Sequence, residues 1–374
     1  MAAVNEMVRS EATVRHPYAD NLKTLLVIGV IVGHSIMAWT GIGNWVFTEP
    51  PVREPVMSIL SMSLIAAMFG MAVFFFIAGI FTPRSLARKG LRKFLLDRTL
   101  RLGLPMLAFV VVLSPVIEYV DTSNVGWERG FWAFTLHIWW PPAPGPTWFL
   151  GVLMLFSTIY AMVRTIRPVA AARLPLRARH LLIPIGAVAV ASYAIRIVVP
   201  LGEERWRLAL GQSPGWVAGF TMGVLAAERG WLPVSPQVSR AVRWAAGVTY
   251  AASVGILGFW ATDATYRDFA GGGAWQSLLV ALCEGVLVAT MPFWLLDLFR
   301  RRFDHQGPVA REMSRSAFAA FLIHQFVLVG LVLASRRTGW SPELNFFVVS
   351  LLGVAISFGV GSMLRRLPGV TRIL

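Results

Sequence analysis

Charge and cysteine are scarce in this sequence. Only 14% of its 374 residues are charged, close to half the share that is typical of soluble domains. The chain has one cysteine, Cys283, which cannot form an internal disulfide, so a disulfide-bonded scaffold is excluded. The 56% of hydrophobic residues excludes a disordered or fibrous chain. Because these residues come in long runs, they indicate an integral membrane protein.

Sequence motifs for several common chemistries are also missing. There is no phosphate-binding loop of the form GxxxxGK(S/T), no HExxH, no cysteine cluster and no GxSxG. The six histidines are scattered without the spacing of metal ligands, so we expect no metal site. The triplet Gly271-Gly272-Gly273 is expected to form a flexible turn rather than a phosphate cradle.

Long apolar runs are what the sequence has instead. A helix that crosses about 30 Å of hydrocarbon needs roughly 20 apolar residues. We therefore predict an all-α integral membrane fold with about ten transmembrane helices. The predicted spans are Leu22–Thr40, Val56–Phe81, Leu102–Val120, Thr147–Val163, Leu181–Pro200, Leu208–Ala227, Trp244–Thr262, Phe269–Leu296, Ser316–Ser335 and Leu344–Leu364. The fifth and sixth are interrupted by Arg196 and by Ser213-Pro214-Gly215.

Basic residues predict the orientation of these helices. The net charge is +15, and most of the 34 lysines and arginines fall on the side of the N-terminus. The residues expected on the opposite side are Arg53, Arg129, Arg196, Arg205, Arg207, Arg267, Arg336 and Arg337. The positive-inside rule then predicts that both termini are cytoplasmic. We expect a cytoplasmic segment over residues 1–21, a membrane domain over 22–364 and a short tail over 365–374. Residues 1–21 lack the features of a signal peptide, so we expect the first span to be retained.

Ionisable residues inside the spans need an explanation, because burying each costs at least about 2.5 kcal/mol. His34 lies about 18 Å into the first span, and Lys23 precedes it by eleven residues on the same helix face. Glu284 lies at a matching depth in the eighth span, so that it can orient the imidazole of His34. His324 lies in the ninth span. Each of these residues is also compatible with an ordinary structural hydrogen bond.

Arg98 and Arg101 lie where the third span enters the membrane. At a spacing of three residues, they are expected to share one helix face. Two guanidinium groups on one face form a bidentate site for phosphate oxygens. A bound lipid headgroup would satisfy them equally well.

Several short motifs occur in order along the predicted spans. These are Asp20-Asn21-Leu22-Lys23 followed by His34, Phe74-Phe75-Phe76-Ile77-Ala78-Gly79, Arg98-Thr99-Leu100-Arg101, Gly145-Pro146-Thr147-Trp148-Phe149-Leu150 and Phe321-Leu322-Ile323-His324. With this order and helix count, the chain resembles the membrane acyltransferase-3 family of bacterial O-acyltransferases. The resemblance extends from Tyr18 to about Leu364.

The resemblance implies a donor and a location. The donor would be cytoplasmic acyl-CoA, most simply acetyl-CoA, with its phosphates on Lys23, Arg98 and Arg101. The protein would lie in the bacterial inner membrane, in contact with lipids and without nucleic acid. Most members have arginine where this chain has Lys23, which leaves a single ammonium at that position. Members usually have serine where this chain has Ala78, so any hydroxyl role there is lost.

The resemblance also implies a catalytic centre. His34 would act as general base or acyl relay, and Glu284 would set its tautomer. Trp148 and His324 would contact substrate. The acceptor would be a hydroxyl of a carbohydrate, glycolipid or small molecule that enters beneath the outer loop around Trp139-Trp140-Pro141-Pro142. That loop is expected to be either a rigid lid or an interfacial aromatic belt.

Two other function classes stay open on the residues alone. Ten spans with buried histidine and glutamate are compatible with a transporter or flippase of glycans or small molecules. Against that class, the two halves show no similarity of the kind that transporters commonly have. A scaffold whose arginines only hold lipid predicts that lysine can replace Arg98 and Arg101 with little effect.

Overall fold

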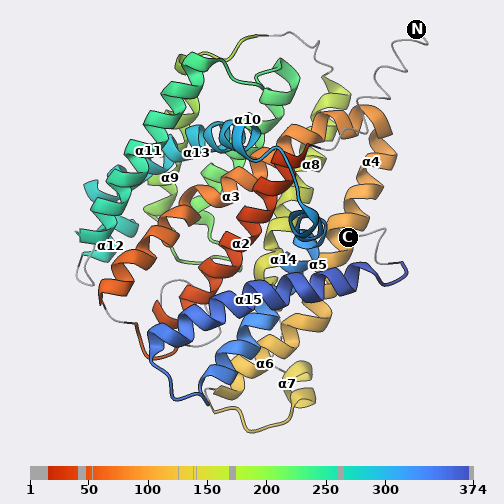
Figure 1. The fold of residues 1–374 in the computed structure, drawn as a ribbon, viewed down its shortest axis with the longest axis vertical. Coiled ribbons are helices and arrows are strands. Elements are labelled where there is room, and N and C mark those ends of the chain that lie inside the picture. Colours follow the sequence, from red (N-terminus) through yellow and green to blue (C-terminus); the bar gives the residue numbers. More distant parts are fainter. Residues whose placement is uncertain are drawn as a thin grey trace.

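The computed structural model describes residues 16–40, 48–52, 54–124, 126–137, 139, 141–167, 174–259 and 265–369, in which all regular elements are helices (Figure 1). The long uninterrupted helices are α2 (Pro17–Thr40), α3 (Glu54–Lys89), α8 (Trp148–Ile166), α9 (Leu182–Arg196), α10 (Ser213–Arg229), α11 (Pro236–Phe259), α13 (Trp275–Arg302), α14 (Pro308–Ser335) and α15 (Pro342–Arg365). A further long helix is built from α4 (Leu91–Arg98), α5 (Leu104–Ala108) and α6 (Ser114–Asn124). The short helices are α7 (Phe131–His137) and α12 (Tyr266–Ala270).

Eight helical segments among the described residues are long and apolar enough to cross a membrane. They correspond to α2, the second half of α3, α4–α6, α8, α9, α13, α14 and α15. The prediction of an all-helical, multi-pass membrane protein is thus confirmed. The sixth and seventh predicted spans fall on α10 and α11, which are not among the eight. The total of ten, and the cytoplasmic position of both termini, stay predictions. Residues 1–15 and 370–374 of the predicted terminal segments lie outside the described residues.

Two predicted boundaries differ from the structure. The second predicted span ends at Phe81, but α3 continues to Lys89 and carries the first basic residues of the loop on the helix. The eighth predicted span begins at Phe269, whereas the structure ends α12 at Ala270 and starts α13 at Trp275. Gly272 and Gly273 separate these helices with φ angles of 71° and 80°, a conformation that glycine adopts without steric cost.

The helix α4–α6 contains two π-helical turns, at 99–103 and 109–113. Each turn ends two residues before a proline, Pro105 or Pro115. Proline has no backbone N–H and its ring clashes with the preceding turn, so a wider turn lets the helix continue past it. The helix therefore crosses its span without a break.

Glycines allow α10 to pack directly on the backbone of α3. A Cβ on Gly219 would overlap the carbonyl of Ala72, and one on Gly223 would overlap that of Phe76. Small residues four apart on a helix allow two backbones to approach closely in a membrane protein. This contact explains why α10, with only 17 residues, has much of its surface buried inside the bundle.

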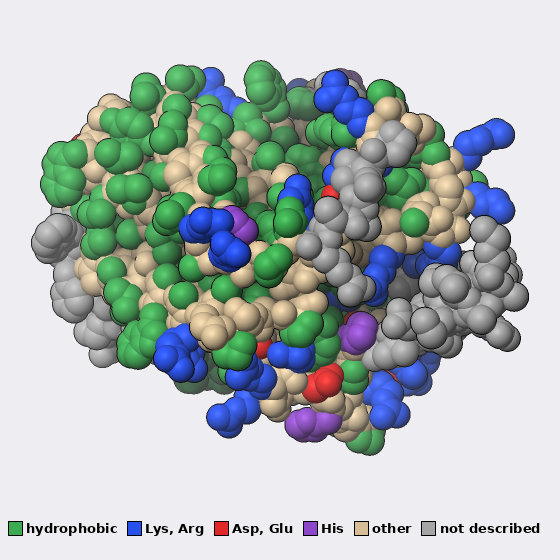
Figure 2. Space-filling view, turned by 90° about the horizontal axis from the view of Figure 1, so that it is seen from above, with side chains coloured by type: hydrophobic (Ala, Val, Ile, Leu, Met, Phe, Trp, Pro, Cys, Tyr) green, Lys and Arg blue, Asp and Glu red, His purple; other side chains and the backbone are tan. Residues whose placement is uncertain are grey.

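The helices enclose two hydrophobic cores, on either side of α2 and α3 (Figure 1). One is shared with α9, α11 and α13, and the other with α4–α6, α8, α14 and α15. Large apolar side chains also point outward, such as Ile183, 76% exposed, and Val190, 69% exposed. In one view, hydrophobic side chains cover much of the surface, and most of the Lys and Arg side chains lie along its lower and right-hand margins (Figure 2). Such an apolar surface is typical of contact with lipid.

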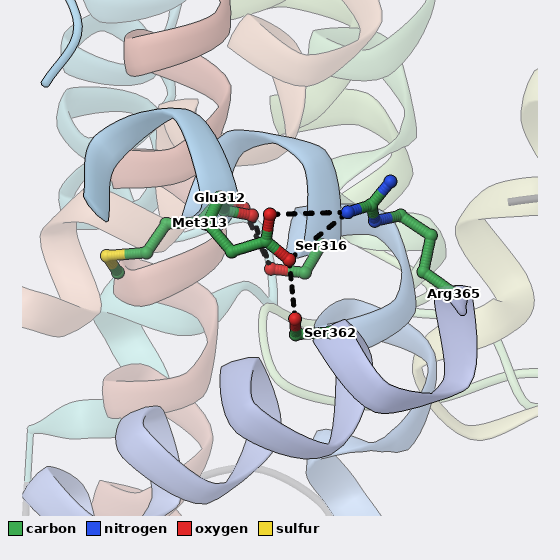
Figure 3. Close-up of polar contacts among 5 residues, drawn as sticks. All are labelled: Glu312, Met313, Ser316, Ser362 and Arg365. Carbon is green, nitrogen blue, oxygen red and sulfur yellow. Dashed lines mark hydrogen bonds and ion pairs between the residues drawn. The ribbon is translucent and has the colours of Figure 1, made fainter. Parts of the chain in front are cut away.

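A polar cluster holds α15 against the first turns of α14. The Glu312 carboxylate accepts hydrogen bonds from Ser362 at 2.5 Å and from Arg365 at 3.1 and 3.2 Å (Figure 3). The Ser316 hydroxyl donates to the carbonyls of Glu312 and Met313 within α14. This cluster fixes the start of α14, and the helix then carries His324 into the bundle.

Candidate active site

Two histidines from opposite ends of the sequence meet inside the bundle. Nδ1 of His34 on α2 and Nε2 of His324 on α14 are 3.1 Å apart, and the ring centroids are 5.0 Å apart. His324 is fully buried, and His34 is partly accessible. The substrate contact predicted for His324 stays a prediction, and in the structure His324 contacts the imidazole of His34.

The hydrogen bonds of this pair determine which nitrogen is basic. Nδ1 of His324 lies 2.5 Å from the carbonyl oxygen of Phe321. A carbonyl only accepts, so this nitrogen carries a hydrogen. With both rings neutral, Nε2 of His324 accepts from Nδ1–H of His34. The lone pair of His34 is then on Nε2, and this assignment follows from the network rather than from observed hydrogens. His34 is thereby oriented as a base.

Aromatic rings connect the histidine pair to the motif that opens α8. The ring of Phe149 packs edge-on against Phe321 at 6.1 Å, and Phe321 lies 5.7 Å from His324. Ahead of α8, Gly145 has a φ of 47°, and a Cβ there would overlap Gln325 and the ring of Phe109. The motifs around Trp148 and His324, about 180 residues apart in the chain, are therefore in direct contact.

Trp148 itself packs against Trp216 of α10. Its ring centroid is 4.4 Å from that of Trp216, with 33° between the planes. Trp216 also lies 6.3 Å from Phe75 of the phenylalanine-rich stretch. The substrate contact predicted for Trp148 stays a prediction.

Contacts at the start of α2 explain the motif Asp20-Asn21-Leu22-Lys23. The ammonium of Lys23 lies 3.3 Å from a carboxylate oxygen of Asp20 and 4.8 Å from the ring centroid of Phe81 on α3. Asn21 donates to the carbonyls of Phe303 and His305 at 2.7 and 2.9 Å. Asn21 therefore attaches α2 to the connection between α13 and α14, a role that sequence reasoning missed.

The two arginines of the third span have different partners. Arg98 is half-buried and lies 3.4 Å from the hydroxyl of Thr82 on α3. Arg101 is exposed and binds Asp97 at 3.1 Å. Their partners differ, and the expected phosphate site that they would form together stays a prediction. Residues 99–103 form a π-helical turn. Over three residues, a π-helical turn rotates about the helix axis by a smaller angle than an α-helix does.

Glu284 is part of a separate buried ion pair. Its carboxylate lies 2.5 Å from Arg196 of α9, and both side chains are fully buried. Arg196 also donates to the carbonyl of Gly211 at 3.0 Å. The partner expected for Glu284 was His34, but His34 is paired with His324 and Glu284 with Arg196. Arg196, which the charge count placed on the outer surface, lies inside the bundle.

Sequence reasoning also missed the role of Arg196, although a signal for it was present. A charge that interrupts an apolar span, in a chain with an opposite charge deep in another span, indicates a buried ion pair. Nothing in the sequence paired these two residues in particular, because both are compatible with several partners.

The outer loop is fixed to the membrane helices at its end. Glu118 of α6 accepts a hydrogen bond from the backbone N–H of Ala143 at 2.8 Å. Arg207 donates to the carbonyl of Pro141 at 3.1 Å. The lid or belt predicted here is only partly described, because Trp140 lies outside the described residues.

These observations define a multi-pass membrane protein with a histidine pair in its interior. The chain matches the family model of an acyltransferase domain over residues 16–364. It therefore belongs to this family of membrane acyltransferases, which confirms the resemblance inferred from the motifs. No curated protein and no solved structure matches the chain.

Proposed function

We propose that this enzyme transfers an acyl group, most simply acetyl, from cytoplasmic acyl-CoA to a hydroxyl of a carbohydrate or a glycosylated acceptor. The observation that supports this proposal best is the contact between His34 and His324. A base inside a membrane protein, oriented by a second side chain, is the arrangement that activates a hydroxyl for acyl transfer.

The reaction balances with His34 as general base. Nε2 of His34 takes the proton of the acceptor hydroxyl, and the oxygen attacks the thioester carbonyl. The carbon–sulfur bond then breaks, and the thiolate of CoA takes the proton back from His34. The products are an ester and free CoA. In a relay version of the mechanism, Nε2 first accepts the acyl group and then passes it to the acceptor.

Within this proposal, His324 is the positioning residue. Its Nε2 accepts the hydrogen of His34 Nδ1 and so keeps the lone pair of His34 on Nε2, which is the role that Glu284 was expected to have. Glu284 stabilises the fold through Arg196. Trp148 shapes the aromatic wall behind the histidines, and the acceptor approaches from the side of the outer loop.

The donor reaches the histidines along α2. Lys23 lies about 16 Å before His34 along the helix axis and within about 20° of it around the axis, since eleven residues are close to three turns. An acyl-CoA molecule whose phosphates stay near Lys23 therefore carries its thioester toward His34. Arg98 contacts Thr82 of α3. Thr82 is next in sequence to Phe81, whose ring Lys23 contacts.

The test is transfer of radiolabel from acetyl-CoA in membranes of the native cell. We expect base-labile label in glycan or lipid fractions, and a fall of about 100- to 10,000-fold in His34→Ala, the range for loss of a general base. The matched control is His305→Ala, which removes an exposed loop histidine and should retain full activity. Size-exclusion chromatography establishes that both variants are folded.

A second variant separates positioning from general structure. His324→Ala should lower the rate less than His34→Ala and shift its pH profile, because the tautomer of His34 is no longer fixed. Normal transfer in folded His34→Ala would overturn the mechanism. Absence of any transfer by the native chain, together with uptake of glycan by vesicles that contain it, would establish the transporter class instead.

A further inference from the structure

A pocket lies between the N-terminal end of α2 and the C-terminal ends of α3, α10 and α13. Its volume is about 270 Å³, close to the lower end of the range for small-ligand sites. Apolar side chains form the inner wall, among them Ile77, Phe81 and Leu296. Arg84 and Arg300 line it as well, each within a few residues of the end of its helix. The pocket is therefore apolar inside and positively charged where its helices end.

The two arginines are available for a ligand. Arg84 is exposed, and the described part of the chain provides no hydrogen bond or ion pair to its guanidinium. Arg300 is 41% exposed and lies 3.4 Å from Asp297. Asp297 has closer partners in Arg301 at 2.9 Å and Ser239 at 2.5 Å. Asp297 thus has two partners closer than Arg300, so Arg300 can turn to an anion while Asp297 keeps its contacts with Arg301 and Ser239.

The pocket adjoins the proposed donor route. Ala19 of α2 lines it, Lys23 lies one helical turn further, and the ring of Phe81 separates the ammonium of Lys23 from the pocket. At about 100° per residue, Ala19, Lys23 and His34 lie within about 60° of one another around α2. Along the axis, Ala19 precedes His34 by about 22 Å. A molecule bound in the pocket must therefore extend by about 22 Å along α2 to reach the histidines.

We propose that this pocket binds the phosphorylated nucleotide end of the acyl-CoA donor, with Arg84 and Arg300 on its phosphate oxygens. This inference rests on the proposed function and replaces the phosphate site expected at Arg98 and Arg101. Arg98 and Arg101, which contact Thr82 and Asp97, are not among the residues that line the pocket. Guanidinium groups bind phosphate through paired hydrogen bonds, and the apolar wall accommodates the base.

The experiment measures binding of acetyl-CoA to the full chain in detergent by calorimetry, without an acceptor. We expect R84Q/R300Q to bind roughly tenfold more weakly or worse, the loss of about one charge-assisted hydrogen bond. The matched control is R88Q/R302Q, which removes the same charge from exposed positions on the same two helices, outside the pocket. Its affinity should stay within about twofold of the native value.

A donor without phosphates provides a readout that a folding defect would not mimic. With S-acetyl-pantetheine, transfer by R84Q/R300Q should equal that of the native chain, because no phosphate is present to lose its partners. R84K/R300K should recover part of the affinity for acetyl-CoA, since the charge returns without the bidentate geometry.

Three results would overturn the inference. If R84Q/R300Q binds acetyl-CoA as tightly as the native chain does, the inference is wrong and the proposed function is unaffected. If R84Q/R300Q keeps its affinity for acetyl-CoA but no longer binds phosphatidylglycerol in mixed micelles, the pocket is assigned to a lipid headgroup. Absence of acetyl-CoA binding by the folded native chain would overturn the proposed function as well.

Discussion

Four ionisable residues inside the membrane helices form two separate pairs. His34 contacts His324 at 3.1 Å, and Arg196 contacts Glu284 at 2.5 Å. A charged side chain in low dielectric is stabilised best by an opposite charge at close range. Arg196 therefore satisfies Glu284 better than a neutral imidazole does. In the proposed mechanism, the histidines provide a base without a net charge, which suits a proton that is taken up and returned within one reaction.

At the residue scale, the buried ion pair predicts a stability effect. Arg196→Met should lower the free energy of unfolding by about 3–5 kcal/mol, because it leaves the Glu284 carboxylate buried without its partner. Arg196→Met/Glu284→Met should recover most of this loss, since neither charge remains. Thermal unfolding can be followed with a thiol-reactive dye on the single, partly buried Cys283. Equal unfolding temperatures for the native chain and Arg196→Met would contradict the prediction.

At the scale of elements, the helices of this bundle depart from regular geometry at positions that shape the site. The π-helical turn after Arg98 directs the two arginines of α4–α6 to different partners. The left-handed backbone of Gly145 allows the start of α8 to approach Gln325 beside His324. The first feature affects the partners of the two arginines, and the second affects the packing beside His324.

The close contact of α3 and α10 predicts a second stability effect. Gly223→Ala should lower the free energy of unfolding by about 1–3 kcal/mol, because the new Cβ overlaps the carbonyl of Phe76 and forces the helices apart. The control is Gly247→Ala on α11, where no heavy atom lies within 4 Å of the new Cβ. Alanine there should be neutral or stabilising by up to about 1 kcal/mol. The dye assay checks both variants, and a native unfolding temperature for Gly223→Ala would refute the packing argument.

At the scale of the whole molecule, the donor pocket and the histidine pair lie at different depths along α2. The pocket is near the start of α2, among helix ends that carry basic residues, and the pair lies within the helices. A donor made in the cytoplasm therefore requires that this end of the bundle faces the cytoplasm. The orientation predicted from the basic residues meets that requirement.

Cysteine labelling tests this orientation. In a Cys283→Ser background, Trp206→Cys should react with a membrane-impermeant maleimide in intact cells, because Trp206 is 88% exposed and is predicted to lie outside. Arg302→Cys, also at an exposed position, should react only after permeabilisation. The opposite pattern would show that the chain is inverted and that the donor pocket faces away from the cytoplasm.

The sequence predicted the class of fold and part of the site. Long apolar runs located helices over each predicted span, although α10, with 17 residues, and α11, with 24, are not among the helices that are long and apolar enough to cross a membrane. His34 was identified because a histidine deep in an apolar run is costly and follows Lys23 at a helical spacing. The partner of His34 was not predicted, because His324 and Glu284 are each compatible with that role when only depth is considered.

The sequence by itself determined that this chain is a helical membrane protein, since hydrophobic length and charge spacing act locally along the chain. It also determined the family, because the motifs and their order along the chain can be read from the sequence. Only the tertiary structure decided which buried groups pair and where Arg84 and Arg300 line a pocket. These features depend on the angle and register at which helices far apart in sequence cross. That geometry is determined by packing among many side chains together, and no single segment encodes it.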